Sequence, residues 1–167
     1  MRIITYQTEG GEIDSSYGEI LQRILDSSDA EIELKFESAG HKLEDLFNSW
    51  DGKSNLIYEL IDLFPDSTNI RILISTTSTS KFANYCKSEL GHAAWGCCLG
   101  GFVAVEYSPD ARLTTQLHES LHLFGVEECY DESTLKPLES CTNDRCLMRY
   151  GVRSNSVCSS VCSQLRS

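Results

Sequence analysis

The spacing of apolar and polar residues in the first half of the chain predicts alternating strands and helices. Three runs alternate strictly or are rich in β-branched residues, which predicts strands at residues 2–7, 31–37 and 70–75. Three other runs repeat apolar residues at intervals of three and four, which predicts helices at residues 17–25, 43–50 and 55–64. A stretch rich in serine and threonine follows the last of these strands, at residues 75–80.

The second half of the chain begins with a glycine pair and ends in a cysteine-rich segment. The glycine pair introduces a further predicted strand at residues 100–107. Residues 108–110 are a capping serine, a first-turn proline and a first-turn acid, so they predict the start of a helix at residues 108–124. Gly125 supplies the stop of that helix. The chain beyond it is rich in loops, with a short helix predicted at residues 157–165.

These elements predict an α/β (α+β) fold in one domain that spans residues 1–167. We expect an N-terminal α/β subdomain at residues 1–125 and a small, irregular, cysteine-rich subdomain at residues 126–167. A length of 167 residues suits one domain with a core of its own.

The net charge of −11 changes the list of expected partners. An acidic surface repels nucleic acid and anionic membranes, so neither is expected to bind. The chain holds no apolar run near the ~20 residues of a membrane helix, and its N-terminus turns polar too early for a signal peptide. We therefore expect a cytoplasmic protein, and a monomer by default.

The predicted helix at 108–124 carries the chemistry of the chain in the segment His118-Glu119-Ser120-Leu121-His122. Two histidines four positions apart project from one face of a helix, so both imidazoles can reach one zinc ion. Glu119 lies beside them and can take a proton from a zinc-bound water. This set predicts metal-assisted hydrolysis.

A third zinc ligand is expected shortly after the helix. The metzincin signature, which this segment resembles, places that ligand three residues after the glycine that follows the helix, and here that residue is Glu128. A turn at Gly125, with positive φ, would let Glu128 return to the metal. Two histidines and one glutamate form a catalytic zinc set in known peptidases. Glu127 is the rival ligand, but it is one position out of register.

The motif that runs from His118 through Gly125 to Glu128 resembles the signature of the metzincins, which normally place a third histidine at the last position. Cys129 follows at once, and then come Cys146-Leu147-Met148 and a closing cysteine pair. In this arrangement the chain is similar to the archaemetzincins over residues 95–162. Three features depart from that family: the glutamate ligand, an insertion that holds Pro137 and Cys141, and a wider spacing of the last two cysteines.

The resemblance implies a metzincin-like fold, in which a mixed twisted sheet carries the active-site helix. It also implies roles for several further residues. Met148 would be the methionine of the Met-turn below the imidazoles, although ordinary core packing would give the same sequence. Tyr150 would hydrogen-bond the oxyanion of the substrate, or be a surface tyrosine. The predicted strand that ends at Tyr107 would be an edge strand that pairs with the substrate backbone, although a core strand would look alike.

The chain has eight cysteines, and five of them lie between Cys129 and Cys162. In a reducing compartment such a cluster more often binds metal, whereas in a secreted protein it would form disulfides. Four thiolates complete a structural zinc site, and the resemblance implies that they come from Cys129, Cys146, Cys158 and Cys162. Cys141 is the strongest substitute. The upstream cysteines, Cys86, Cys97 and Cys98, are expected to be inert core thiols.

The sequence therefore predicts a zinc metallopeptidase that hydrolyses peptide or protein substrates, with Glu119 as the base. One catalytic zinc and one structural zinc are expected. The alternative is a non-catalytic zinc-binding protein that keeps this scaffold for binding or regulation. An intact Glu119 favours the enzyme, whereas Glu128 and the altered cysteine spacing favour the binding protein.

Overall fold

A computed structural model describes residues 1–8, 10–38, 40–53, 55–64, 70–77, 79–90, 96–99, 102–106 and 112–165 of the chain. Its strands are β1 (Arg2–Gln7), β2 (Lys35–Ser38), β3 (Ile70–Thr76), β4 (Gly96–Leu99) and β5 (Phe102–Glu106). Its helices are α1 (Tyr17–Ser27), α2 (Gly40–Ser49), α3 (Leu56–Leu63), α4 (Lys81–Leu90), α5 (Arg112–His122) and α6 (Ser159–Leu165).

The five strands form one mixed sheet in the order β2-β1-β3-β5-β4. Neighbouring strands are parallel from β2 to β5, and β4 is antiparallel to β5 at the edge. Strand β3 lies in the middle, and all of its residues except Arg71 are buried. A strand that is covered on both faces needs a continuous apolar sequence, which Ile70–Thr76 supplies.

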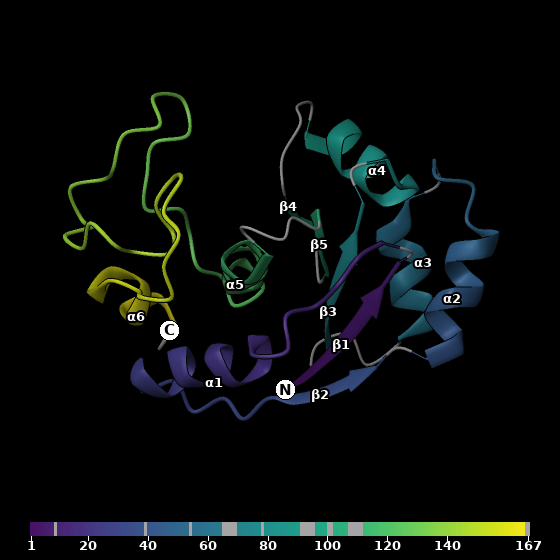
Figure 1. Ribbon diagram of the computed structural model, residues 1–167, viewed down its shortest axis with the longest axis horizontal. Helices are drawn as coiled ribbons and strands as arrows, with labels where there is room; N and C mark the ends of the chain where they lie inside the picture. Colours follow the sequence, from purple (N-terminus) through teal and green to yellow (C-terminus); the bar gives the residue numbers. More distant parts are fainter. Residues whose placement is uncertain are drawn as a thin grey trace.

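Helices cover both faces of this sheet. Consecutive residues of β1 point to opposite faces, so Ile3 joins the core formed with α1, α5 and α6, while Ile4 joins the core formed with α2, α3 and α4. The first core continues into the C-terminal segment, residues 126–165, and includes Met148. Figure 1 shows α5 end-on between the sheet and this C-terminal segment. Helix α5 therefore packs between the sheet and the C-terminal segment, and α1 contacts α6 of that segment as well.

Most of the predicted elements are present with similar bounds. Strands β1 and β3 and helices α1, α2 and α3 confirm the predictions, and so do the mixed α/β fold and the cysteine-rich segment that follows α5. Strand β2 starts at Lys35 instead of residue 31, and its four residues are all exposed at the sheet edge. The glycine pair and the helix start signals at 108–110 lie outside the described residues.

Two elements were not predicted, and one expectation was wrong. Helix α4 begins directly after the serine- and threonine-rich stretch, where Ser80 Oγ accepts the backbone N–H of Ala83 at 3.1 Å and caps the helix. Strand β4 is a short antiparallel addition. Because β4 pairs with the outer side of β5, strand β5 is an interior strand and not the predicted substrate-binding edge.

The described helices include none whose length and apolar character would let it span a lipid bilayer.

Candidate metal centre

Helix α5 presents His118 and His122 side by side, with ring centroids 5.2 Å apart. Each ring is fixed by a backbone carbonyl: His118 Nδ1 lies 3.0 Å from Leu147 O, and His122 Nδ1 lies 2.7 Å from Val126 O. When Nδ1 donates to a carbonyl, the lone pair of the neutral ring is on Nε2. Metal-binding histidines are commonly oriented in this way.

The chain leaves α5 through a tight turn around Gly125. The N–H of Gly125 donates to His122 O at 3.0 Å, and the N–H of Val126 donates to Leu121 O at 3.3 Å. These two bonds form a Schellman motif, which needs a left-handed residue at its centre. Gly125 has φ +80°, as the sequence predicts. The turn directs the following residues back toward the two histidines.

Glu128 completes the group. Its Oε1 lies 3.2 Å from both His118 Nε2 and His122 Nε2. Its Oε2 is buried and has no hydrogen-bond partner within the described part of the chain. Glu127, the rival ligand, is exposed, and its backbone N–H donates to Gln164 Oε1 at 2.7 Å. The structure thus brings together His118, His122 and Glu128, with their ligand atoms within 4.8 Å of one another.

The charges of the three groups are strongly coupled. Although burial alone would lower it, the Glu128 carboxylate raises the pKa of His118 to about 9, and it raises the pKa of His122 as well. Burial opposes ionisation of Glu128, yet the hydrogen bonds from the two rings lower its pKa to about 2. Each of these shifts favours the charged form of its group, so a cation at this site would compete with the proton on the imidazoles.

Glu119 lies on α5 between the two histidines. Burial raises the pKa of its carboxyl group, and the Glu128 charge adds to this effect, while the two histidines oppose it. A general base works best when its pKa lies close to the working pH, so a raised pKa suits that role.

The opposite face of α5 is held by buried polar contacts. Ser120 Oγ lies 2.7 Å from Tyr17 Oη of α1. The Gln116 side chain donates to Glu12 O at 2.7 Å and accepts the backbone N–H of Asp14 at 3.0 Å. Buried polar groups that are satisfied in this way fix the rotation of the helix. They therefore fix the direction in which His118 and His122 project.

A second group of ligand-type side chains lies in the C-terminal segment. The Sγ atoms of Cys129, Cys141, Cys146 and Cys158 lie within 4.8 Å of one another, and all four residues are buried. Cys129 Sγ is 3.6 Å from Cys158 Sγ and 3.8 Å from Cys146 Sγ. Burial raises the pKa of Cys129, and it raises the pKa of Cys146 to about 12.

This cysteine cluster differs from the predicted set in one member. Cys162 lies outside the cluster, where its Sγ accepts a hydrogen bond from Ser28 Oγ at 3.4 Å. Cys141, the substitute that the sequence offered, takes the fourth position. The insertion that holds Cys141 folds back so that the N–H of Leu138 donates to Cys129 O at 3.0 Å. Sequence spacing alone could not reveal this closure.

The upstream cysteines also require a correction. Cys86 of α4 is disulfide-bonded and is not the free core thiol that the sequence predicted. The side chains of Cys97 and Cys98 lie outside those that the structure describes.

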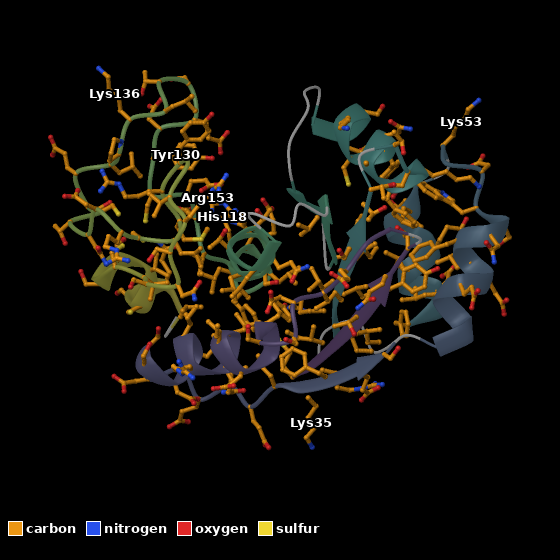
Figure 2. All side chains as sticks on the ribbon, viewed as in Figure 1. Lys35, Lys53, His118, Tyr130, Lys136 and Arg153 are labelled. Atoms are coloured by element: carbon orange, nitrogen blue, oxygen red, sulfur yellow. The ribbon has the colours of Figure 1, made fainter. Side chains whose placement is uncertain are left out.

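Met148, Tyr130 and Tyr150 lie in the C-terminal segment that follows the histidines. Met148 is fully buried, as a methionine below the imidazoles would be. Tyr150 is 60% exposed, and its ring packs edge-on against Tyr130 with centroids 5.6 Å apart. Burial and the charge of Glu128 raise the pKa of Tyr130, so this tyrosine lies closer to the charged group. Figure 2 labels His118 on α5 and Tyr130 in the C-terminal segment. The sequence did not single out Tyr130.

The fold and the site together define a mixed α/β protein in which two histidines of the central helix meet a glutamate from the segment after it, next to a cluster of four cysteines. No protein-family model matches the sequence, and no curated protein matches it. Among solved structures, the chain is similar to the crystal structure of archaemetzincin from Methanopyrus kandleri. The identity is 17% and the TM-score 0.45, over 99% of this chain and 93% of that one.

Proposed function

We propose that this protein is a zinc-dependent peptidase whose metal is held by His118, His122 and Glu128. The observation that carries the proposal is the pair of equal 3.2 Å separations between the two Nε2 atoms and Glu128 Oε1. Two ligands about 2.05 Å from a tetrahedral zinc are about 3.3 Å apart, so these atoms have the spacing of a zinc shell. Glu128 Oε2, which is buried without a hydrogen-bond partner among the described residues, also fits a site for a cation.

The cysteine cluster fits a second, structural zinc by the same test. Two sulfurs about 2.3 Å from a tetrahedral zinc are about 3.8 Å apart. The observed Sγ separations of 3.6 Å and 3.8 Å agree with that spacing. We propose that Cys129, Cys141, Cys146 and Cys158 hold this ion, with Cys141 in place of Cys162.

Each side chain has a defined task in the proposed reaction. Zinc, when bound, acidifies water and polarises the peptide carbonyl. Glu119 accepts the proton of the attacking water at its carboxylate and returns it to the amine of the leaving peptide. Leu147 O and Val126 O hold the rings of His118 and His122 in place throughout the reaction. The formal negative charge of Glu128 makes the centre less electrophilic than one with three histidines.

The test compares wild-type protein with Glu119→Ala in metal content and in cleavage of an unbiased peptide pool. We expect both proteins to retain zinc, because Glu119 is not among the three grouped ligands. The variant should lose at least about 100-fold in kcat, because a general base contributes that much. Equal cleavage by the two proteins would contradict the mechanism.

The same comparison separates the enzyme from a non-catalytic zinc-binding protein. The binding protein would retain zinc in both forms and cleave none of the peptides. His118→Ala serves as the matched control, because it should lose the ion itself together with the activity.

A further inference from the structure

Strand β4 begins with a residue that lies directly against Glu119. Gly96 is that residue, and it pairs with Val105 of β5 in the antiparallel edge of the sheet. A Cβ atom built on Gly96 would lie 2.4 Å from Glu119 Cγ, 2.6 Å from its Cδ and 2.7 Å from its Oε1. The side chain of Glu119 therefore occupies the space that any side chain at position 96 would fill.

The glycine at position 96 is required for space and not for its backbone conformation. Gly125 and Gly151 have φ of +80° and +71°, and an added Cβ at either position would meet no atom of the described residues within 4 Å. Gly96 shows the opposite pattern, because its φ lies outside the left-handed region while its added Cβ collides with one side chain. The role of Gly96 is therefore tied to Glu119.

The backbone around Gly96 has little freedom to relieve such a collision. Strand β4 is paired with β5 along its whole length, and α5 packs against both strands. The atoms that can move are those of the Glu119 side chain, since rotation about its χ angles costs less energy than a shift of the paired backbone. An alanine at position 96 would therefore rotate the Glu119 carboxylate and leave the strand in place.

We infer that Gly96 is a positioning residue for the general base, because it leaves open the one space in which Glu119 lies beside His118 and His122. This inference rests on the proposed function and deepens it. A base must stay within hydrogen-bond reach of the proton that it removes, at about 2.6–3.2 Å. A displacement of about 1 Å at a reacting group can cost about 100-fold in rate.

The experiment uses Gly96→Ala in the full chain, with Gly18→Ala as the matched control. Gly18 lies in α1, where the nearest atoms to an added Cβ belong to the side chain of Phe36, the first at 3.1 Å. We expect Gly96→Ala to lower kcat about 100-fold, with zinc affinity at His118 and His122 within about twofold of wild type. Gly18→Ala should keep wild-type kcat and zinc affinity.

A double-mutant cycle with Glu119→Ala distinguishes positioning from general damage. Alanine lacks Cγ, Cδ and Oε1, the three atoms that an added Cβ at position 96 would meet. Gly96→Ala should therefore cost less than about threefold in the residual kcat of the Glu119→Ala background. An equal loss in both backgrounds would show that the substitution acts elsewhere, and unchanged kcat in the single variant would also overturn the inference.

Crystal structures of the two glycine variants give a readout that is independent of activity. The Glu119 carboxylate should move by about 1 Å or more in Gly96→Ala, following the displacement argument above, and should not move in Gly18→Ala. An unmoved Glu119 in Gly96→Ala would refute the positioning role. If wild type binds zinc but cleaves no peptide, the proposed function fails, while this structural comparison still decides whether Gly96 places Glu119.

Discussion

The side chain of His118 is held at both of its ring nitrogens. Nδ1 faces Leu147 O, and Nε2 faces Glu128 Oε1. In the metal-free protein this environment raises the pKa of His118 from 6.5 to about 9. The proton on His118 stabilises the folded protein. Its contribution to the free energy of unfolding is complete below the unfolded-state pKa and is lost as the pH rises through the folded-state pKa.

Zinc affinity at the His–His–Glu group should therefore depend on pH. Between pH 6.5 and 9 zinc has to displace a proton from His118, so the apparent affinity should rise by up to about tenfold per pH unit. Competition titrations against a zinc-binding dye at pH 6.5, 7.5 and 8.5 measure this slope. In Glu128→Gln the pKa of His118 returns toward its ordinary value, so the slope should flatten above about pH 7. A wild-type affinity that does not change with pH would contradict the assigned proton.

The turn at the C-terminal end of helix α5 determines where the next residues of the site lie. The Schellman motif at Gly125 returns the chain so that Val126 O meets His122 Nδ1, and Glu128 meets both rings two residues later. Arg71 of β3 donates from Nε to Leu123 O at 2.9 Å, which ties this end of the helix to the central strand. A cation at the C-terminus of a helix also interacts favourably with the helix dipole.

Gly125→Ala should separate the energetic and functional roles of this turn. The added Cβ meets no atom within 4 Å in the part of the chain that the structure describes, so the cost of about 1 kcal/mol arises from the left-handed backbone. Gly52→Ala is the matched control, because Gly52 has φ +78° and lies far from the site in sequence, between α2 and α3. Chemical denaturation should show a similar loss of unfolding free energy in both variants. Zinc affinity should fall about tenfold in Gly125→Ala only, and an equal affinity in the two variants would contradict a role for the turn in placing Glu128.

The sequence predicts those features that follow from local spacing. Two histidines four apart share a helix face, and a glycine after the helix indicates a left-handed turn; both inferences need only local geometry. Helix α4 also has a local sequence signal, because Ser80 can cap a helix and Phe82 and Cys86 lie on one face of it. The serines and threonines before Ser80 made this signal hard to distinguish from a loop.

Features that depend on long-range packing could not be predicted. The edge position of β4 depends on how five strands order themselves, and a four-residue strand has almost no periodicity of its own. The choice of Cys141 over Cys162 depends on how the insertion closes onto Cys129. The contact between Gly96 and Glu119 joins two elements that no sequence pattern links.

Across the whole molecule, the two ligand groups are connected through two short stretches of chain. Glu128 precedes Cys129 directly, and the N–H of Cys129 donates to Met148 O at 2.9 Å. Cys146 lies next to Leu147, whose carbonyl orients His118. The cysteine cluster is therefore adjacent in sequence to one member of the His–His–Glu group, Glu128, and to Leu147, whose carbonyl orients another.

Cys141→Ser and Cys162→Ser should test this connection. Cys141→Ser removes one of the four grouped thiols, so we expect one bound zinc fewer per chain and a zinc affinity about tenfold lower at the His–His–Glu group. Cys162→Ser changes a thiol outside the cluster and should keep the wild-type zinc content. Elemental analysis gives the content, and dye competition gives the affinity. Loss of zinc in Cys162→Ser with full content in Cys141→Ser would reverse the assignment.

The bond between His118 and Leu147 O also sets an order of events during protein synthesis. The histidines emerge from the ribosome well before residues 146–158, which provide that carbonyl and two of the grouped cysteines. A nascent chain that has reached Glu128 thus carries all three ligands of the His–His–Glu group, but not the contact that orients one of its rings. The His–His–Glu group is therefore complete only when a later part of the chain has folded onto it.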